Sequence, residues 1–389
     1  MRQRAGVSDT LRGSVNFRRR RAGRAVRMGP SAQRVAWAFA AVSTSAQLAA
    51  QAPEAGRVVP VQVVSEADGT VLAGDLHRPG GDAQRAAVVL LGVAGPDDRD
   101  LSAGPIAPFG ALARHLQSHG VAVLTLDDRG VGGSGGDWSR ADYAMLVLDA
   151  LSAVDHLARR PDVDAGRIGL LGLSEGSAIA MMAAAEATGR VAFLVLGSPP
   201  GLLGEEALRL QLVTMLANAG IEGDAAAHVH TTFDRFVSLA RAAGSDSTAR
   251  SEFERFLAGP GRTLVPPYRF VPSDPAGRAA LFSGPWYRSQ LDYDPATFLA
   301  RVTVPTLVIG GALDPVLPPV EHHPSIAAAI ASTDTRFEVV NGVNHLLLPA
   351  TTGAPAEYSR IRASADPRVL ALIVDWLEAR GFLHRRREP

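Results

Sequence analysis

The feature that most constrains this chain of 389 residues is a Gly-x-Ser-x-Gly pentapeptide between an apolar run and an alanine-rich run. The apolar run covers residues 168–173, and the pentapeptide places Ser174 between Gly172 and Gly176. This order predicts a strand that turns sharply into a helix, with the serine at the turn. Glycine fits both flanking positions, because a Cβ there would clash where strand and helix approach each other. We therefore expect the Ser174 hydroxyl to project from the end of a sheet.

The same turn gives the next residue a predicted role. Glu175 would open the helix, and its backbone N–H would point to the place where an oxyanion forms if Ser174 attacks a carbonyl carbon. The alternative for the pentapeptide alone is an ordinary Gly-Ser turn on the surface. The rest of the sequence distinguishes the catalytic elbow from the surface turn.

Composition narrows the class of protein. Apolar residues make up 47% of the chain and charged residues 20%, which is enough apolar material for a large core. The formal net charge is zero and no basic stripe with interleaved aromatic residues runs through the body of the chain, so we expect no nucleic-acid partner. Without cysteine, the chain forms no disulfide and has no thiolate nucleophile.

The first 55 residues differ from the rest. Arginines cluster at 18–21 and recur to Arg34, an apolar stretch follows at 35–42, and Ala-Gln-Ala ends at Ala52 before Pro53. Basic, apolar, then Ala-x-Ala is the order of a secretory signal, so we expect residues 1–55 to be a leader outside the fold and the protein to be exported, either periplasmic or extracellular. An arginine-rich disordered tail on a cytoplasmic protein is the alternative. The apolar stretch is too short and too interrupted for a stable membrane span.

Residues 56–389 show the pattern of one α/β domain. Two β-rich segments around an Asp-Gly turn predict an N-terminal antiparallel hairpin. Apolar strands then alternate with helices, which predicts a mostly parallel sheet covered on both faces. The expected strands are 86–91, 121–126, 168–173, 191–196, 305–311 and 337–340, and the expected helices are 109–119, 141–159, 319–331 and 369–377.

The alternation stops at about residues 204–299. This segment contains helical runs at 208–219 and 232–243, then a Pro- and aromatic-rich part, with no convincing strand. We predict an inserted helical cap here.

Two further candidates lie where parallel strands end. Asp314 follows the strand that ends in Gly-Gly, and His345 follows the next strand. Ser, Asp, His in this order, each after a strand, fits a catalytic triad. Ser174 would attack an acyl carbonyl, His345 would carry its proton to the leaving group, and Asp314 would orient the imidazole. Taken singly, Asp314 is equally well a turn residue and His345 a loop residue.

Other motifs predict less. The glycines at 130–135 match Gly-x-Gly-x-x-Gly, but no helix opens on them, so we expect a tight loop whose Asp127 and Arg129 brace the elbow region, and no nucleotide. His228 and His230, and the pair His322-His323, lack the carboxylates of a metal site. We expect no metal and no organic cofactor.

Four segments together carry a family resemblance. They are Gly-Pro-Asp-Asp-Arg-Asp at 95–100, Leu-Asp-Asp-Arg-Gly-Val-Gly at 126–132, the elbow at 168–176, and Asn-His-Leu at 344–346. Over about residues 61–377 the chain resembles the α/β-hydrolase superfamily, in particular a bacterial esterase-like or serine-aminopeptidase-like group. The resemblance implies the α/β-hydrolase fold and Ser174, Asp314 and His345 as the triad.

The resemblance also locates a second oxyanion donor on the loop after the first buried strand. Members commonly have Gly and Ser where this chain has Val93 and Ala94, so one of these two backbone N–H groups would act together with that of Glu175. The chain departs again in having Ser177 in place of a second glycine, and leucine after His345 in place of phenylalanine.

We therefore predict a serine hydrolase that cleaves carboxylic esters of small molecules through an acyl-enzyme. An aminopeptidase-like peptidase or an acyl thioesterase would use the same triad. The alternative from another class is a catalytically silent binding protein with the same fold.

Overall fold

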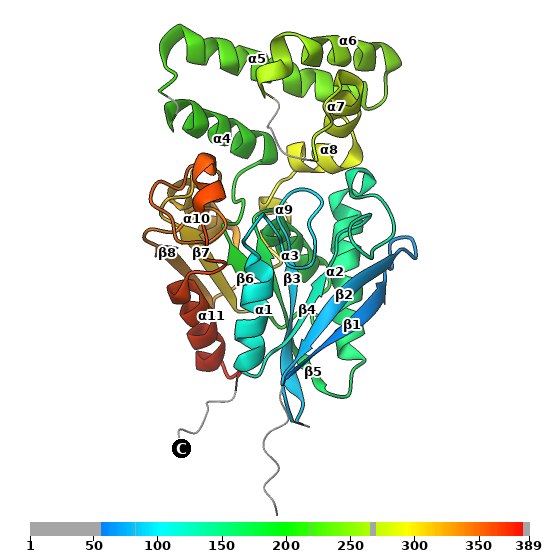
Figure 1. The fold of residues 1–389 in the computed structure, drawn as a ribbon, viewed down its shortest axis with the longest axis vertical. Coiled ribbons are helices and arrows are strands. Elements are labelled where there is room, and N and C mark those ends of the chain that lie inside the picture. Colours follow the sequence, from blue (N-terminus) through cyan, green and yellow to red (C-terminus); the bar gives the residue numbers. More distant parts are fainter. Residues whose placement is uncertain (1–55, 82, 219, 265–269, 384–389) are drawn as a thin grey trace, which may run out of the picture. The chain divides into compact units, whose positions relative to one another are not determined.

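The computed structural model describes residues 56–81, 83–218, 220–264 and 270–383. The predicted leader, residues 1–55, lies outside them. Eight strands form one sheet in the order β1-β2-β4-β3-β5-β6-β7-β8 (Figure 1). The strands are β1 (Arg57–Val64), β2 (Val71–Arg78), β3 (Arg85–Leu91), β4 (Ala122–Leu126), β5 (Val163–Leu173), β6 (Phe193–Gly197), β7 (Thr306–Gly311) and β8 (Thr335–Val340).

The sheet combines an antiparallel start with a parallel body, as predicted. Strand β1 pairs antiparallel with β2, and β2 antiparallel with β4, while every pair from β4 to β8 is parallel. Strands β6 and β7 are buried at every residue, whereas along β1 at the edge exposed residues alternate with half-buried ones and only Val63 is buried. Continuous apolar runs therefore form the centre of the sheet because both of their faces are covered.

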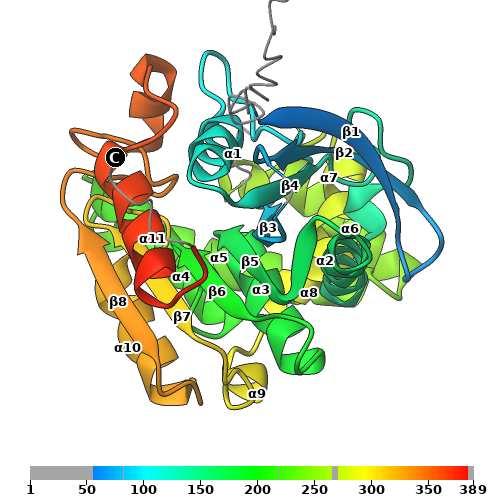
Figure 2. The same cartoon turned by 90° about the horizontal axis from the view of Figure 1, so that it is seen from below.

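Helices cover the two faces of the sheet. Helices α1 and α11 share one hydrophobic cluster with one face, and α2 and α3 share another with the opposite face (Figure 2). The shorter helices α9 and α10 flank the second face, and the 3-10 helices η1 and η3 lie in loops. The bounds are α1 (Pro108–Ser118), α2 (Tyr143–Ala158), α3 (Glu175–Glu186), α9 (Ala296–Leu299), α10 (Pro319–Ala329), α11 (Pro367–Ala379), η1 (Trp138–Arg140) and η3 (Pro355–Arg360).

Local capping sets several helix starts. The carboxylate of Asp142 accepts a hydrogen bond from the N–H of Met145, so α2 begins at Tyr143 and not at residue 141. In the same way Asp366 accepts from the N–H of Arg368 at the start of α11, where a proline occupies the first position.

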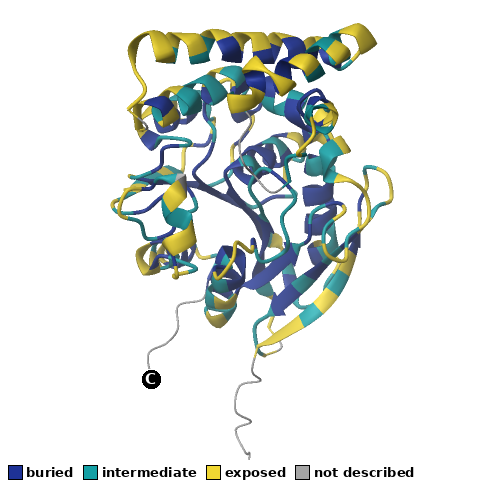
Figure 3. Cartoon of the chain, turned by 45° about the horizontal axis from the view of Figure 1, so that its top comes forward, coloured by how far each residue is buried: buried dark blue, intermediate teal, exposed yellow. Residues whose placement is uncertain are grey.

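Between β6 and β7 the chain forms helices and no strand among its described residues. We call α4–α8, with the 3-10 helix η2, the cap. Its helices enclose a hydrophobic cluster of their own, with buried faces turned inward and exposed faces outward (Figure 3). Tyr293, Phe298 and Leu299 pack in the core cluster instead. The bounds are α4 (Gly204–Asn218), α5 (Gly223–Ala243), α6 (Ser247–Ala258), η2 (Pro260–Leu264), α7 (Pro275–Phe282) and α8 (Pro285–Leu291).

Within the described ranges, no helix has both the length and the hydropathy that crossing a bilayer requires.

Candidate active site

Ser174 occupies a sharp corner between β5 and α3. Its backbone has φ +56° and ψ −118°, a left-handed conformation that costs a non-glycine residue about 1–3 kcal/mol. A Cβ on Gly172 would lie closer than 3.0 Å to the backbone of Gly176, and one on Gly176 would lie equally close to the carbonyl oxygen of Leu91. The two glycines therefore allow β5, α3 and the end of β3 to meet at this corner.

The structure brings the three predicted triad side chains together. His345 Nε2 lies 3.0 Å from Ser174 Oγ, and His345 Nδ1 lies 2.8 Å from Asp314 Oδ2. The three residues follow β5, β8 and β7, so they meet at the carboxyl edge of the parallel strands. All three are buried, with exposed fractions of 9% or less. This geometry allows Ser174 to give a proton to an imidazole that is held by a carboxylate.

Backbone groups fix the carboxylate of Asp314. Its Oδ1 accepts hydrogen bonds from the N–H groups of Val316 at 2.8 Å and Leu317 at 2.9 Å. Only Oδ2 faces His345, so the Nδ1–H of the ring donates to it and Nε2 is left as the acceptor for the serine hydroxyl.

Two supports of the histidine loop were not found from the sequence. Ser198, at the end of β6, donates its hydroxyl to the carbonyl of His345 at 2.8 Å. Asn344 Oδ1 accepts from the N–H groups of Leu346 and Leu348, which closes the turn around the histidine. Asn344 stands next to His345 in the sequence, which is a usable signal, whereas Ser198 is distant and offers none.

The three predicted oxyanion donors differ in their partners. Glu175 is the first residue of α3, so its N–H belongs to the helix turn that has no acceptor within the helix. The N–H of Val93 donates to Asp97 Oδ2 at 3.0 Å, and Ala94 follows it on the loop after β3. The same loop contacts the elbow directly, because Gly92 accepts from the N–H of Gly176 at 2.8 Å.

The Glu175 side chain is enclosed by neutral donors. Its carboxylate accepts from Tyr143 Oη at 3.1 Å, Trp286 Nε1 at 3.1 Å and Gln290 Nε2 at 2.8 Å. Burial raises the pKa of Glu175 to about 7, and these three donors oppose the rise. The carboxylate thus has its hydrogen bonds, but no positive charge from the described part of the chain acts on it.

The prediction that Arg129 and Asp127 brace the elbow region is wrong, because both residues bind partners outside it. Arg129 is bidentate on Asp149 of α2, with contacts of 2.6 and 2.8 Å, and also contacts Asp68 in the turn between β1 and β2. Asp127 pairs with Arg99 at 2.7 Å. The Asp-Asp-Arg segment before the glycines therefore joins the glycine loop to the N-terminal hairpin and to α2. Its contacts stabilise the fold around the site and do not involve Ser174.

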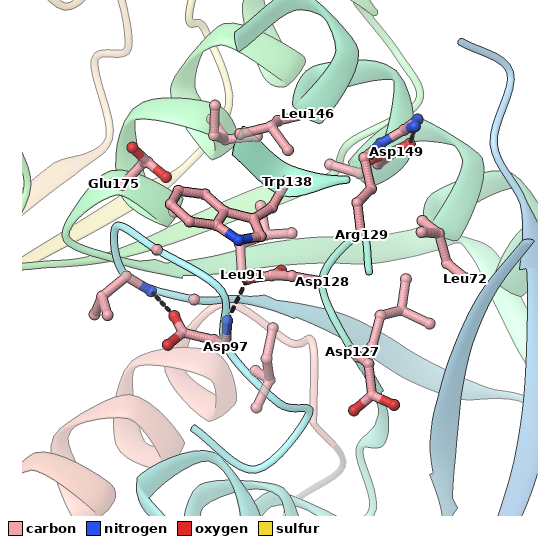
Figure 4. A pocket seen from close by; sticks show the side chains of 18 of the residues that line it. Leu72, Leu91, Asp97, Asp127, Asp128, Arg129, Trp138, Leu146, Asp149 and Glu175 are labelled. Atoms are coloured by element: carbon pink, nitrogen blue, oxygen red, sulfur yellow. Dashed lines mark hydrogen bonds and ion pairs between the residues drawn. The ribbon is translucent and has the colours of Figure 1, made fainter. Parts of the chain in front are cut away.

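A cavity next to the elbow collects further carboxylates (Figure 4). Asp97, Asp128 and Glu175 line it beside Trp138 and Leu91, and the N–H of Asp97 donates to Asp128 Oδ2 at 2.8 Å. Burial, followed by the charges of neighbouring carboxylates such as that of Glu175, raises the pKa of Asp128 to about 8 and also raises the pKa of Asp97. No pattern in the sequence indicated that these acids would meet, because they come from the loop after β3, the loop after β4 and the start of α3.

The remaining histidines form no metal centre in the part of the chain that the structure describes, where no group of three or more His, Asp or Glu side chains could hold an ion. His322 is buried, and its Nδ1 accepts from the N–H of Gly201 at 2.9 Å. Burial lowers the pKa of His322 and of His323 to about 4, so both are neutral core residues at pH 7.

Comparison with known proteins agrees with the fold. The model of the alpha/beta hydrolase fold family matches residues 88–349. Esterase EstD of Thermotoga maritima is 26% identical over 307 residues, which cover 79% of this chain and 65% of that protein. An uncharacterized protein of Mycobacterium tuberculosis is 37% identical over 158 residues, covering 39% of this chain and 51% of its own length. The chain thus spans less than two thirds of either relative.

Solved structures with the same fold are distant in sequence. An alpha/beta hydrolase of Penicillium superposes with a TM-score of 0.52 at 17% identity, covering 83% of this chain and 98% of its own. An esterase of Pyrococcus furiosus superposes with a TM-score of 0.50 at 15% identity, covering 83% of this chain and 91% of its own. Since the family model covers more than half of the sequence and the sheet order and elbow agree with it, the chain belongs to the alpha/beta hydrolase fold family.

Proposed function

We propose that this protein is a serine hydrolase that cleaves carboxylic esters through an acyl-enzyme, with Ser174, His345 and Asp314 as its triad. The observation that carries the proposal is the continuous hydrogen-bond chain from Ser174 Oγ through His345 to Asp314 Oδ2, on a backbone corner held in a strained conformation. The relative named esterase and the family membership support the same class of reaction.

The first half-reaction forms the acyl-enzyme. Ser174 Oγ bonds to the ester carbonyl carbon while its proton passes to His345 Nε2, and the imidazolium is stabilised by Asp314. The carbonyl oxygen becomes an oxyanion, to which the N–H of Glu175 and a donor of the loop after β3 hydrogen-bond. Because the N–H of Val93 is engaged by Asp97, Ala94 is the donor that we propose on that loop. The bond to the leaving oxygen then breaks, and His345 gives it the proton, so an alcohol departs.

The second half-reaction restores the serine. A water molecule gives a proton to His345 Nε2 as its oxygen bonds to the acyl carbon, and a second oxyanion forms in the same place. When this intermediate collapses, the bond to Ser174 Oγ breaks and the proton returns to the serine. The carboxylic acid is released.

One contact favours esters over peptides with a free amine. A recognition site for a substrate ammonium needs an available carboxylate, and the acid closest to the nucleophile in sequence is Glu175. Its oxygens are already engaged by Tyr143, Trp286 and Gln290. A catalytically silent binding protein does not require a serine, a histidine and an aspartate joined by hydrogen bonds in this order, so the arrangement favours an enzyme.

A labelling and substrate experiment tests the proposal. The purified protein is treated with a fluorophosphonate probe, and mass spectrometry finds the labelled peptide, which we expect to contain Ser174. Rates are then measured on p-nitrophenyl esters of increasing acyl length, on aminoacyl anilides and on acyl thioesters. Fastest turnover of the esters supports the proposal, whereas preference for the anilides or thioesters, or no covalent labelling at all, contradicts it.

A further inference from the structure

The carboxylate of Glu175 joins three elements that are far apart in the sequence. It belongs to α3, Tyr143 belongs to α2 in the core, and Trp286 and Gln290 belong to α8 in the cap. Among the described residues no arginine forms an ion pair with it, so the donors from α2 and α8 are what compensates its burial. Loss of the α8 donors would leave this acceptor inside the protein with only the hydroxyl of Tyr143.

Helix α8 is fixed to the rest of the cap. The ring of Tyr287 packs edge to face against Phe236 of α5 and Phe282 of α7, with centroids 5.9 and 5.0 Å apart, and Trp286 and Tyr287 both lie in the hydrophobic cluster of the cap. A displacement of the cap therefore moves Trp286 and Gln290 relative to Glu175. Ser289 adds a second tie, since its hydroxyl accepts from the N–H of Tyr143 at 3.1 Å.

We infer that Glu175 is a positioning residue through which the position of the cap determines the geometry of the oxyanion donor. The inference rests on the proposed function, in which the backbone N–H of this residue contacts the oxyanion. One residue then carries both ends of the connection: its side chain binds the cap, and its main chain, one bond away from Ser174, takes part in the chemistry. Because hydrogen bonds at a reacting centre are sensitive to displacements of about 1 Å, a loosened α8 should lower the rate of the chemical step.

The groups around Glu175 make the connection sensitive to pH. The charge of Glu175 acts on Asp97 from the loop after β3, on Asp128 from the loop after β4 and on Tyr143 from α2. Burial makes Glu175 hold its proton more tightly than a solvated glutamate does, whereas the donors of α8, Gln290 and Trp286, oppose this because they stabilise the carboxylate. While Glu175 stays enclosed, its contact with α8 is therefore strengthened as it ionises and is weaker at lower pH.

The test compares two variants that remove a donor to Glu175 with one control variant. Tyr143→Phe removes the core donor to Glu175, and Gln290→Leu removes a cap donor. Tyr287→Phe is the matched control, because it removes a phenol hydroxyl from α8 whose oxygen does not contact Glu175. The substrate is p-nitrophenyl acetate, whose small acyl group keeps direct contacts with the cap to a minimum. We expect Tyr143→Phe and Gln290→Leu to lower kcat about tenfold with KM changed less than threefold, and Tyr287→Phe to lower neither.

Amide hydrogen exchange provides a readout that does not depend on turnover. In Gln290→Leu we expect faster exchange both in α8 and in the first turn of α3. In Glu175→Gln we expect the protection factors of α8 to lose the dependence on pH between 6 and 8 that the ionisation of Glu175 gives the wild type. Unchanged kcat with faster exchange in α8 alone would overturn the inference while leaving the proposed function intact. An inactive wild-type protein, or an active Ser174→Ala variant, would overturn the proposed function and with it the role of Glu175.

Discussion

At the scale of single residues, hydrogen bonds to neighbouring groups hold Asp314 and His345 in place. In each residue they leave free the atoms that face the next member of the chain from Asp314 to Ser174. Asp314 binds two backbone N–H groups through Oδ1 and presents Oδ2 to the imidazole. The carbonyl of His345 is held by Ser198, which leaves the ring free to meet Ser174. Such fixed orientations reduce the rearrangement that the reaction requires.

Ser174→Ala should abolish ester hydrolysis and leave the fold intact. Removing the nucleophile of a triad lowers kcat by about 10⁶. The alanine keeps the same Cβ at the strained corner, so thermal unfolding should shift little. Steady-state rates on p-nitrophenyl esters and a melting curve measure the two quantities. Turnover that remains within about tenfold of wild type, in material free of host esterases, would rule out Ser174 as the nucleophile.

The sequence predicted that Ser174, Asp314 and His345 would come together, as they do, but not the partners of the acids around them. Ser174, Asp314 and His345 each follow a strand, and the carboxyl ends of parallel strands meet at one edge, so local pattern and topology were sufficient to place them. Arg129 was expected to brace the elbow region, and instead it binds Asp149 and Asp68. The cap donors to Glu175, Trp286 and Gln290, belong to a helix more than 100 positions away in the sequence, and packing decides which segments meet across such a distance.

At the scale of elements, the elbow depends on close approach between backbones. Strand β5 ends beside β3, and α3 begins where the loop after β3 passes over it. The type and order of the strands and helices followed from apolar periodicity. Their ends were predicted less well, because they depend on side-chain caps such as Asp142 and on the 3-10 helix η1 before α2.

Gly176→Ala should destabilise the protein strongly. The added Cβ would lie closer than 3.0 Å to the carbonyl oxygens of Leu91 and Gly92, which are backbone atoms at the end of β3 and in the loop after it. We expect a loss of about 3 kcal/mol or more in the free energy of unfolding, measured by urea denaturation. Gly166→Ala is the control: Gly166 is exposed in β5, the strand before the elbow, and its Cβ would meet an atom only at the ordinary distance of 3.4 Å. Equal stability of the two variants would contradict the steric explanation.

At the scale of the whole molecule, buried carboxyl groups and buried histidines change the stability of the protein in different parts of the pH range. The folded-state pKa values of Glu175 and Asp128 are raised to about 7 and about 8, so their contribution to stability is full below the unfolded values and is lost as pH rises through the folded ones. For His322 and His323 the folded-state pKa is lowered to about 4, so stability is lost as pH falls from 6.5 towards 4. Above pH 6.5 only the carboxyl groups act.

We therefore expect the melting temperature to fall by a few degrees between pH 6.5 and pH 8, corresponding to a loss on the order of 1–2 kcal/mol. Asp128→Asn should flatten this part of the curve, because an amide does not ionise. Differential scanning calorimetry of both proteins over that interval measures the effect. A flat wild-type profile, or an equally steep one in the variant, would show that these acids do not control stability there.

Export remains a proposal that rests on the order of basic, apolar and Ala-x-Ala segments in residues 1–55. If it is correct, the mature chain isolated from the periplasm or the medium begins between about Ala50 and Pro53. Mass spectrometry of the N-terminal peptide from fractionated cells identifies the start. Recovery of cytosolic protein that still begins at Met1 or Met28 would count against export.

The insertion of the cap between β6 and β7 has a consequence for how the protein can diversify. The whole cap is a single excursion whose ends lie side by side, because the N–H of Gly204 at its start donates to the carbonyl of Tyr293 just after its end at 2.8 Å, and lengthening such an excursion adds little closure entropy. Exchange of the cap between homologues, in nature or in the laboratory, is therefore topologically simple. It has one chemical condition: a grafted cap that brings no hydrogen-bond donors to Glu175 would leave a buried carboxylate with a single donor beside the nucleophile. Whether a chimera folds and is active should then depend on the presence of donors equivalent to Trp286 and Gln290 of α8, however well the remainder of the graft fits.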